Sequence, residues 1–187
     1  FIYEGLKGRK PCIYVSITQD FDSVEEQVKM NFGWSFKRYL QKGRLKFVDF
    51  YSLWMEKPPD VTKTLNLKDL MDRISKAEEE VTGGRELIHN FSSLFNFAED
   101  NQSILRMAHA IRAKAKKAGT TVLFLLDEGA QDKSAEENIK SLCDYILKTD
   151  VRGHEVKIRV TKSLTRHSLE WHSLILTEKG VKVEIIR

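Results

Sequence analysis

An aspartate and a glutamate follow directly on the most apolar run of the chain. Residues 122–126 read Val-Leu-Phe-Leu-Leu, and Asp127 and Glu128 come next. A carboxylate pair at the end of an apolar strand can hold a Mg²⁺ ion and polarise water, as in a Walker B motif with its catalytic glutamate. The alternative is a pair without a catalytic role at the carboxyl end of a core strand, where open α/β sheets form their clefts.

Histidines offer two further candidate sites. His89 beside Asn90 could form a catalytic pair, although a single histidine at a strand end is more often a hydrogen-bonded structural residue. His167 and His172 lie near Trp171 and could suggest a metal or stacking site. Because their spacing provides no tetrahedral ligand set, we predict no metal site.

A basic cluster could bind nucleic acid. Its members fall on one predicted helix: Arg106, Arg112, Lys114, Lys116 and Lys117. No aromatic residues that could stack on bases interleave with these charges, so a solvated helix face is the favoured interpretation. The net charge of +4 permits an anionic partner without requiring one.

The elements that must position these residues follow from apolar periodicity. Strands are predicted at 12–17, 45–50 and 120–126, with a further apolar run at 85–91, and helices at 22–32, 66–81, 102–118 and 135–143. Residues 51–63 are predicted to be irregular, and Asp22 or Ser23 is predicted to cap the helix at 22–32. The continuous apolar run at 120–126 is typical of a central parallel strand.

Short strands dominate the C-terminal part of the chain. They are predicted at 145–147, 155–161, 173–176 and 181–185, the last two joined as a hairpin through the turn 177–180. Alternating strands and helices followed by these strands predict an α/β fold. Its mainly parallel central sheet is flanked by helices, with an antiparallel C-terminal hairpin extension at one edge.

Length and composition indicate one globular domain spanning residues 1–187. Hydrophobic residues make up 41% and charged residues 31%, and no apolar run approaches the roughly 18 residues that cross a bilayer. Cys12 and Cys143 are far apart and belong to no metal-ligand pattern, which favours free thiols in a reducing compartment. We therefore expect a cytoplasmic protein without a membrane partner.

The order and spacing of several blocks resemble the KaiC-like ATPases of the RecA superfamily, which are abundant in archaea. The blocks are Phe1–Leu6, Pro11–Ser16, Asn31–Trp34, Gly43–Asp49, Gly119–Leu126, Leu142–Leu147, Thr165–His167 and Ile175–Gly180. The resemblance implies a RecA-type fold, and it implies assembly, either as a homo-oligomer or with a KaiC-like partner subunit.

The family's phosphate-binding P-loop, G-x-x-x-x-G-K-[ST], lies just before the helix that ends in the block Phe1–Leu6. The sequence given contains no such motif. Because Phe1–Leu6 already resembles the later part of a helix, we expect that a segment precedes Phe1. ATP and Mg²⁺ are expected as ligands only if that segment supplies the P-loop.

Two further family positions depart from the active pattern. Active members carry two glutamates after the strand at 12–17, and this chain has Thr18 and Gln19 there, with Asp20 next. Neither Thr18 nor Gln19 can act as a general base near neutral pH. The Walker B position of the family corresponds to His89, whose neutral imidazole is a poor ligand for Mg²⁺.

A basic stretch of the family, K-x-R-G-T, contacts phosphates across the subunit interface. Aligned on Thr165–His167, the lysine and arginine positions hold Thr161 and Ser163, whereas a one-residue gap restores Lys162. Lys162 and Arg166 are therefore possible phosphate contacts. The segment Tyr51–Met55, ahead of Pro58 and Pro59, could instead contact another subunit, or could pack on its own domain.

These departures favour a degenerate, noncatalytic KaiC-like domain that acts through oligomerisation or regulatory protein contact. The first alternative is an ATPase whose P-loop lies before Phe1, with Asp20, Asp127 or Glu128 replacing the missing carboxylates. The second alternative is a DNA-binding relative of the recombinases, whose DNA affinity would fall steeply with salt.

Overall fold

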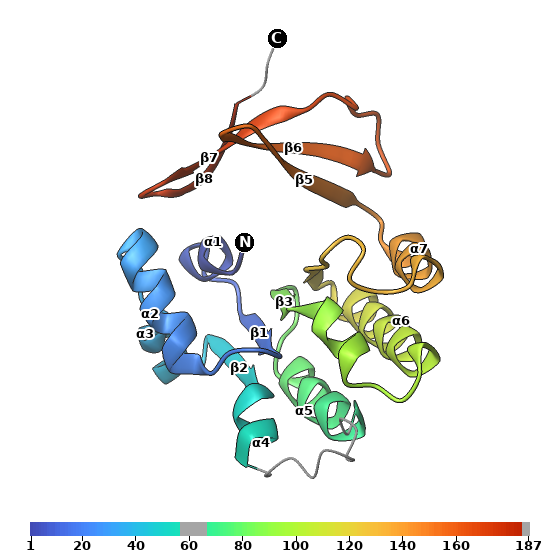
Figure 1. Ribbon diagram of the computed structural model, residues 1–187. Helices are drawn as coiled ribbons and strands as arrows, with labels where there is room; N and C mark the ends of the chain where they lie inside the picture. Colours follow the sequence, from blue (N-terminus) through green and yellow to red (C-terminus); the bar gives the residue numbers. More distant parts are fainter. Residues whose placement is uncertain (57–66, 185–187) are drawn as a thin grey trace.

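The computed structural model describes residues 1–56 and 67–184, which form two four-stranded sheets and their flanking helices (Figure 1). The first part contains α1 (Ile2–Lys7), β1 (Cys12–Ser16), α2 (Phe21–Phe32), α3 (Lys37–Gln41), β2 (Leu45–Asp49), α4 (Tyr51–Glu56), α5 (Leu67–Glu79) and β3 (Arg85–His89). The second part contains the 3₁₀ helix η1 (Phe91–Asn96), α6 (Asn101–Ala118), β4 (Thr121–Phe124), α7 (Lys133–Leu142), β5 (Ile146–Arg152), β6 (Glu155–Lys162), β7 (His172–Thr177) and β8 (Gly180–Glu184).

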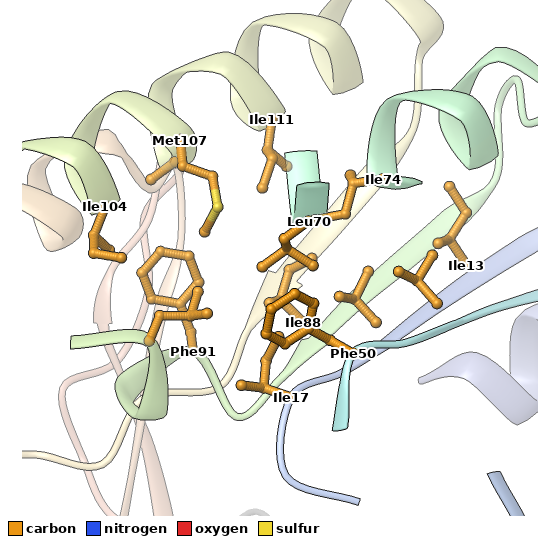
Figure 2. Packing of buried hydrophobic residues seen from close by; sticks show 14 of the residues in the cluster. Ile13, Ile17, Phe50, Leu70, Ile74, Ile88, Phe91, Ile104, Met107 and Ile111 are labelled. Carbon is orange, nitrogen blue, oxygen red and sulfur yellow. The ribbon is translucent and has the colours of Figure 1, made fainter. Parts of the chain in front are cut away.

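The first sheet, called the parallel sheet below, has the strand order β2-β1-β3-β4 with every pair parallel. All five residues of β1 are buried, because this strand lies between two neighbours and is covered on both faces. On one face Ile13, Val15 and Ile17 pack with Ile88 and with side chains of α5 and α6. Figure 2 shows Ile13, Ile17 and Ile88 in this layer. This is the alternation that a strand between two helical layers requires.

The other face of the parallel sheet is covered by α1, α2 and α3. Cys12 and Tyr14 point to this side, where they pack with Leu6, Val24 and Tyr39. Two apolar layers therefore hold the parallel strands in register and fix the positions of the loops that follow them.

The second sheet, called the C-terminal sheet below, is antiparallel with the order β5-β6-β7-β8. The α/β fold class predicted from the sequence is confirmed, including the antiparallel C-terminal hairpin. The predicted attachment at one edge of the parallel sheet differs, because no strand of the C-terminal sheet pairs with a parallel strand in the described residues. Strand β5 is also longer than the predicted 145–147, because its whole length pairs with β6.

The position of β4 corrects a second expectation. Residues 120–126 were predicted to form a central strand covered on both faces, but β4 pairs with β3 alone among the described residues and lies at one edge of the parallel sheet. Thr121 is exposed and the other three residues of β4 are only partly buried. A continuous apolar run therefore marked a strand of this sheet correctly without fixing its place in the strand order.

Aspartates that the sequence analysis did not assign as caps hold the first turns of α2 and α4. Asp20 accepts a hydrogen bond from the Ser23 N–H at 2.8 Å and caps α2, where Asp22 or Ser23 was predicted. Asp49 accepts from the Ser52 N–H at 2.8 Å, so residues 51–56 form α4 instead of the predicted irregular segment. Leu53 of α4 packs on its own core, and Pro58 and Pro59 lie outside the described residues.

No helix in the described ranges has both the length and the apolar character needed to span a membrane. Cys12 is buried on β1, Cys143 is half-buried after α7, and both thiols are free. Burial raises the pKa of both thiols, which keeps them protonated and unreactive near neutral pH.

Candidate functional site

The loops after β1, β3 and β4 carry most of the residues that the sequence singled out. These strands are neighbours and parallel, so their carboxyl ends lie at one edge of the sheet. The residues at this edge are Thr18, Gln19, Asp20, His89, Asn90, Asp127 and Glu128. Open α/β sheets bind ligands at this edge, which makes it the candidate site.

Asp127 is held by polar groups of the loop after β3. Asn90 Nδ2 donates to Asp127 Oδ2 at 2.5 Å, while the Asp127 N–H donates to Ser92 Oγ at 2.8 Å. Asn90 Oδ1 also accepts from the Ser92 N–H at 2.9 Å and caps η1. The Asp127 carboxylate is thus part of a connected network that joins the ends of β3 and β4.

Ser92 and Gln131 also hold Asp127, although neither was predicted as a site residue from the sequence. Gln131 Nε2 donates to the Asp127 carbonyl oxygen at 3.1 Å. The pattern Asn90-x-Ser92 directly after a strand is typical of a turn closed by an asparagine side chain, and this signal could have indicated the network.

Glu136 fixes the loop that carries Asp127 and Glu128. Its carboxylate accepts from the Gly129 N–H at 3.0 Å and from Gln131 Nε2 at 2.7 Å, and it pairs with Lys140 at 2.7 Å. The bond to Lys140, with those from Gly129 and Gln131, outweighs burial and lowers the Glu136 pKa to about 2. The loop is therefore anchored by a carboxylate that stays ionised at any physiological pH.

Glu128 points toward the C-terminal sheet. Its carboxylate pairs with Lys148 of β5 at 2.6 Å, and the glutamate side chain is largely exposed. Glu128 therefore bridges the parallel part of the fold to the C-terminal sheet.

His89 is the last residue of β3 and is partly buried, and its Nδ1 has no hydrogen-bond partner among the described residues. Burial lowers the His89 pKa, although the Asp127 carboxylate opposes this. The Tyr14 ring contacts the imidazole edge-on with a centroid distance of 6.1 Å. At neutral pH this position thus holds an uncharged imidazole.

Hydrogen bonds within the loop after β1 and to the start of α2 fix the loop's conformation. Ser16 Oγ donates to the Gln19 carbonyl oxygen at 2.6 Å, which fixes the backbone that carries Thr18 and Gln19. Asp20 is half-buried, and its bonds from Ser23 lower its pKa as expected for a helix cap. This loop presents a hydroxyl, an amide and a capping carboxylate.

Lys162 and Arg166, the possible phosphate contacts, occupy different environments. Lys162 Nζ donates to the carbonyl oxygens of Lys140 at 3.1 Å and Ser141 at 3.0 Å, which satisfies the C-terminal end of α7. Arg166 is exposed in the loop between β6 and β7. Lys162 therefore attaches the C-terminal sheet to α7 in this structure.

Among the candidates near the C-terminal sheet, Trp171 and His167 have structural partners, whereas His172 Nδ1 has no hydrogen-bond partner among the described residues. The guanidinium groups of Arg152 and Arg159 both stack over the Trp171 ring, at 4.4 and 4.6 Å from its centroid. His167 Nδ1 lies 3.0 Å from the Thr165 carbonyl oxygen. Over residues 1–56 and 67–184, no three His, Cys, Asp or Glu side chains converge in a way that could hold a metal ion.

The basic cluster of α6 is largely engaged in ion pairs on the helix surface. Arg112 pairs with Asp144 at 3.1 Å and Lys114 with Glu78 at 3.2 Å, while Arg106 lies 3.9 Å from the Asp100 carboxylate. These contacts fit the solvated helix face favoured from the sequence.

The fold and the site together define a RecA-type α/β domain. Comparison with known proteins identifies the family: the pattern described as "ATPase: KaiC" matches residues 1–186. This chain belongs to the KaiC ATPase family.

Relatives and a solved structure agree with this assignment. The chain is 23% identical to UPF0273 protein MK0039 of Methanopyrus kandleri, covering 98% of this chain and 76% of that protein. It is 22% identical to UPF0273 protein PH0284 of Pyrococcus horikoshii, covering 98% and 77%. The crystal structure of the KaiC-like protein PH0186 from P. horikoshii has the same fold, with a TM-score of 0.76, 19% identity and coverage of 99% and 81%.

Proposed function

We propose that this chain is a noncatalytic member of the KaiC family that acts through protein contacts, by self-assembly or by joining a KaiC-like partner subunit. The observation that carries the proposal is His89. It stands at the family's Walker B position, where an aspartate carboxylate holds Mg²⁺ through its water shell, and it offers an uncharged, partly buried imidazole.

The described residues at the candidate site do not fit Mg²⁺. This cation prefers oxygen ligands in octahedral geometry, and it keeps several waters. The Asp127 carboxylate accepts a hydrogen bond from Asn90, and the Glu128 carboxylate forms an ion pair with Lys148. The Asp20 carboxylate caps α2. Each carboxylate that could replace the family's aspartate already serves a structural contact.

The position where active members of the family carry a base that activates water holds no base in this chain. Thr18 and Gln19 stand where active members have two glutamates, and neither side chain accepts a proton near neutral pH. These side chains, together with His89, support a domain whose role does not require hydrolysis.

The test is a hydrolysis assay with Mg-ATP on this chain and on the longest product of its gene. The proposal expects release of phosphate no faster than in a buffer control. A rate above background that falls at least about tenfold on Asp20→Ala, Asp127→Ala or Glu128→Ala would overturn it and establish the ATPase alternative. Lys148→Ala serves as the matched control, because it removes the partner of Glu128 and leaves all three carboxylates in place.

A further inference from the structure

A carboxyl group is buried in the apolar layer between the parallel sheet and the helices α5 and α6. Glu86 of β3 lies opposite Ile13 on β1 and opposite Val122 on β4, and residues directly opposite each other share a face of a sheet. Ile13 packs with side chains of α5 and α6, so Glu86 points into the same layer. Both cross-strand neighbours are apolar and cannot balance a charge on Glu86.

The two helices bring the charged groups that face Glu86. Glu78 of α5 lies one turn after the buried Ile74, and Lys114 of α6 lies three residues after the buried Ile111. Figure 2 shows Ile74 and Ile111 in the apolar layer. Residues three or four apart lie on the same face of a helix, so Glu78 and Lys114 stand at the border of this layer. Lys114 Nζ lies 3.2 Å from Glu78 Oε2 and also donates to Ser75 Oγ.

Glu78 and Glu86, called the carboxyl pair below, have one cation between them. Glu86 is fully buried, and its carboxyl oxygens have no hydrogen-bond partner among the described residues. The Glu78 side chain is only 10% exposed. If both carboxyls were ionised beside Lys114, one negative charge would remain unbalanced in an apolar layer, which is strongly unfavourable. One proton bound by the carboxyl pair removes that charge.

The pKa shifts agree with this count of charges. Burial, and then the neighbouring Glu78, raise the pKa of Glu86 to about 8, against the opposing effect of Lys114. Burial also raises the pKa of Glu78, against its ion pair with Lys114. The folded chain therefore keeps a proton at pH values at which both carboxyls would be ionised in water.

The last turns of α5 are the part of the layer that can move most easily. Glu86 is held in β3 by pairing with strands on both sides. Helix α6, which carries Lys114, has six buried residues along its length, whereas α5 has three. Repulsion within an ionised carboxyl pair is thus relieved at least cost when the end of α5 moves away from β3 and water reaches Glu86.

We propose that the carboxyl pair and Lys114 form a pH-sensitive latch, in which one bound proton holds the last turns of α5 against β3 and loss of the proton releases them. Below pH 4.5 the closed and open forms both keep the proton, and the latch is fully closed. As the pH rises above this value, the open form loses the proton first, because its carboxyls are hydrated. The open form therefore gains on the closed form until the closed form also ionises.

The test is amide hydrogen exchange of the chain from pH 5.5 to pH 9, with each rate corrected for the intrinsic pH dependence of exchange. The open form should lose its proton near the ordinary pKa of 4.5 and the closed form near 8. The opening equilibrium of residues 75–79 should therefore rise about 70-fold between pH 5.5 and 7.5 and level off above pH 8. Because the opening is local, the amides of β1 should stay more protected than those of α5 throughout.

Substitutions of three glutamates test the count of charges. Glu86→Gln leaves one carboxylate beside Lys114, so the rise in the α5 opening equilibrium should fall to less than about fivefold. Glu78→Gln removes the like charge next to Glu86 and should move the levelling-off to a lower pH. Glu79→Gln makes the same chemical change at an exposed neighbour on α5 and should leave the wild-type curve unchanged.

Carbon NMR of the glutamate carboxyl groups gives a second readout. The wild type should show one carboxyl carbon that titrates near pH 8, and Glu86→Gln should lack it. An opening equilibrium of α5 that does not vary with pH, or a rise that persists in Glu86→Gln, would overturn the inference. Equal protection of α5 and β1 with the same pH dependence would also overturn it, because the proton would then control unfolding of the whole domain. None of these outcomes depends on whether the chain hydrolyses ATP.

Discussion

The parallel sheet and the C-terminal sheet have the same number of strands but opposite relations to solvent. Strand β1 of the parallel sheet is buried along its whole length, whereas β8 of the C-terminal sheet is exposed apart from Gly180. The parallel sheet is covered by helices on both faces, and the C-terminal sheet has one face turned to the molecule and one to solvent. The first sheet therefore carries the stability of the domain, and the second presents a surface.

The largest expected effect is a difference in the free energy of unfolding when one apolar side chain is truncated in each sheet. Ile88→Ala on β3 removes a fully buried side chain and should lower the free energy of unfolding by about 3 to 4 kcal/mol. Val151→Ala on β5 should lower it by less than about 0.5 kcal/mol, since the side chain is exposed. Urea unfolding measures both changes. Equal losses of unfolding free energy in the two variants would contradict the conclusion that the parallel sheet carries the stability of the domain.

The next effect concerns Glu86, a fully buried carboxyl on β3 whose oxygens have no hydrogen-bond partner among the described residues. Burial, and then the neighbouring Glu78, raise the Glu86 pKa to about 8, against the opposing effect of Lys114. Between pH 4.5 and about 8 the unfolded chain has lost this proton while the folded chain keeps it. The stability that the bound proton confers is therefore lost as the pH rises through this window.

Glu86→Gln keeps the shape of the protonated side chain and removes its ionisation. The variant should be about 3 kcal/mol more stable than the wild type at pH 8 and nearly equal to it at pH 4.5, as urea unfolding at the two pH values would show. Glu80→Gln on the protein surface is the control and should not produce this dependence. A wild type whose stability does not fall across this window would refute the raised pKa.

A smaller effect is expected for Glu25, which ties α2 to the start of α3. Its carboxylate accepts from Ser35 Oγ at 2.6 Å, from the Phe36 N–H at 2.6 Å and from the Lys37 N–H at 3.1 Å. Burial alone would raise the Glu25 pKa, but these bonds and Lys29 together lower it. The stability that the ionised Glu25 carboxylate provides is thus present above pH 4.5 and is lost as the pH falls through the lowered pKa.

Glu25→Gln should reduce the free energy of unfolding by about 1 to 2 kcal/mol at pH 7 and by less at pH 3. Guanidinium unfolding at the two pH values measures the difference. The neighbouring exposed Glu26→Gln is the control, with an expected change within about 0.5 kcal/mol. A loss that does not shrink at pH 3 would show that the carboxylate charge is not the cause.

The smallest effect tests the attachment of the C-terminal sheet to the rest of the domain. Lys162→Met removes two charged hydrogen bonds to the end of α7 and should cost about 1 kcal/mol, with faster amide exchange in the last turn of α7. Lys148→Met breaks only an exposed pair with Glu128 and should cost less than about 0.5 kcal/mol. Unchanged exchange in α7 after Lys162→Met would show that this lysine is not the attachment.

Sequence periodicity predicted most helices and strands because their apolar spacing is a local property. The helix predicted at 102–118 is α6 within one residue, since Asp100 and Gly119 bound it with a cap at each end. The missed features depended on contacts between distant segments. The separate C-terminal sheet and the edge position of β4 both follow from which segments meet in space. The short helix α4 was missed for a different reason, because its cap by Asp49 is local but its apolar pattern is too short to indicate a helix.

The candidate site divides in the same way. That Thr18, Gln19 and His89 stand at key positions of the KaiC family could be read from the residues themselves. The sequence could not predict the hydrogen bond from Asn90 to Asp127 or the ion pair between Lys148 and Glu128. It also could not predict that Lys162 donates to carbonyl oxygens at the end of α7. In each case the two partners come from different elements.

The sequence alone thus determined the family, the α/β class and the chemical identity of each side chain at the edge of the parallel sheet, since these depend on residue type and short-range spacing. Only the tertiary structure decided which carboxylates are already engaged and which face of the C-terminal sheet is turned toward the rest of the molecule. Alternation divides the side chains of a strand into two sets, but the contacts of Glu128 and α7 determine which set faces the rest of the molecule.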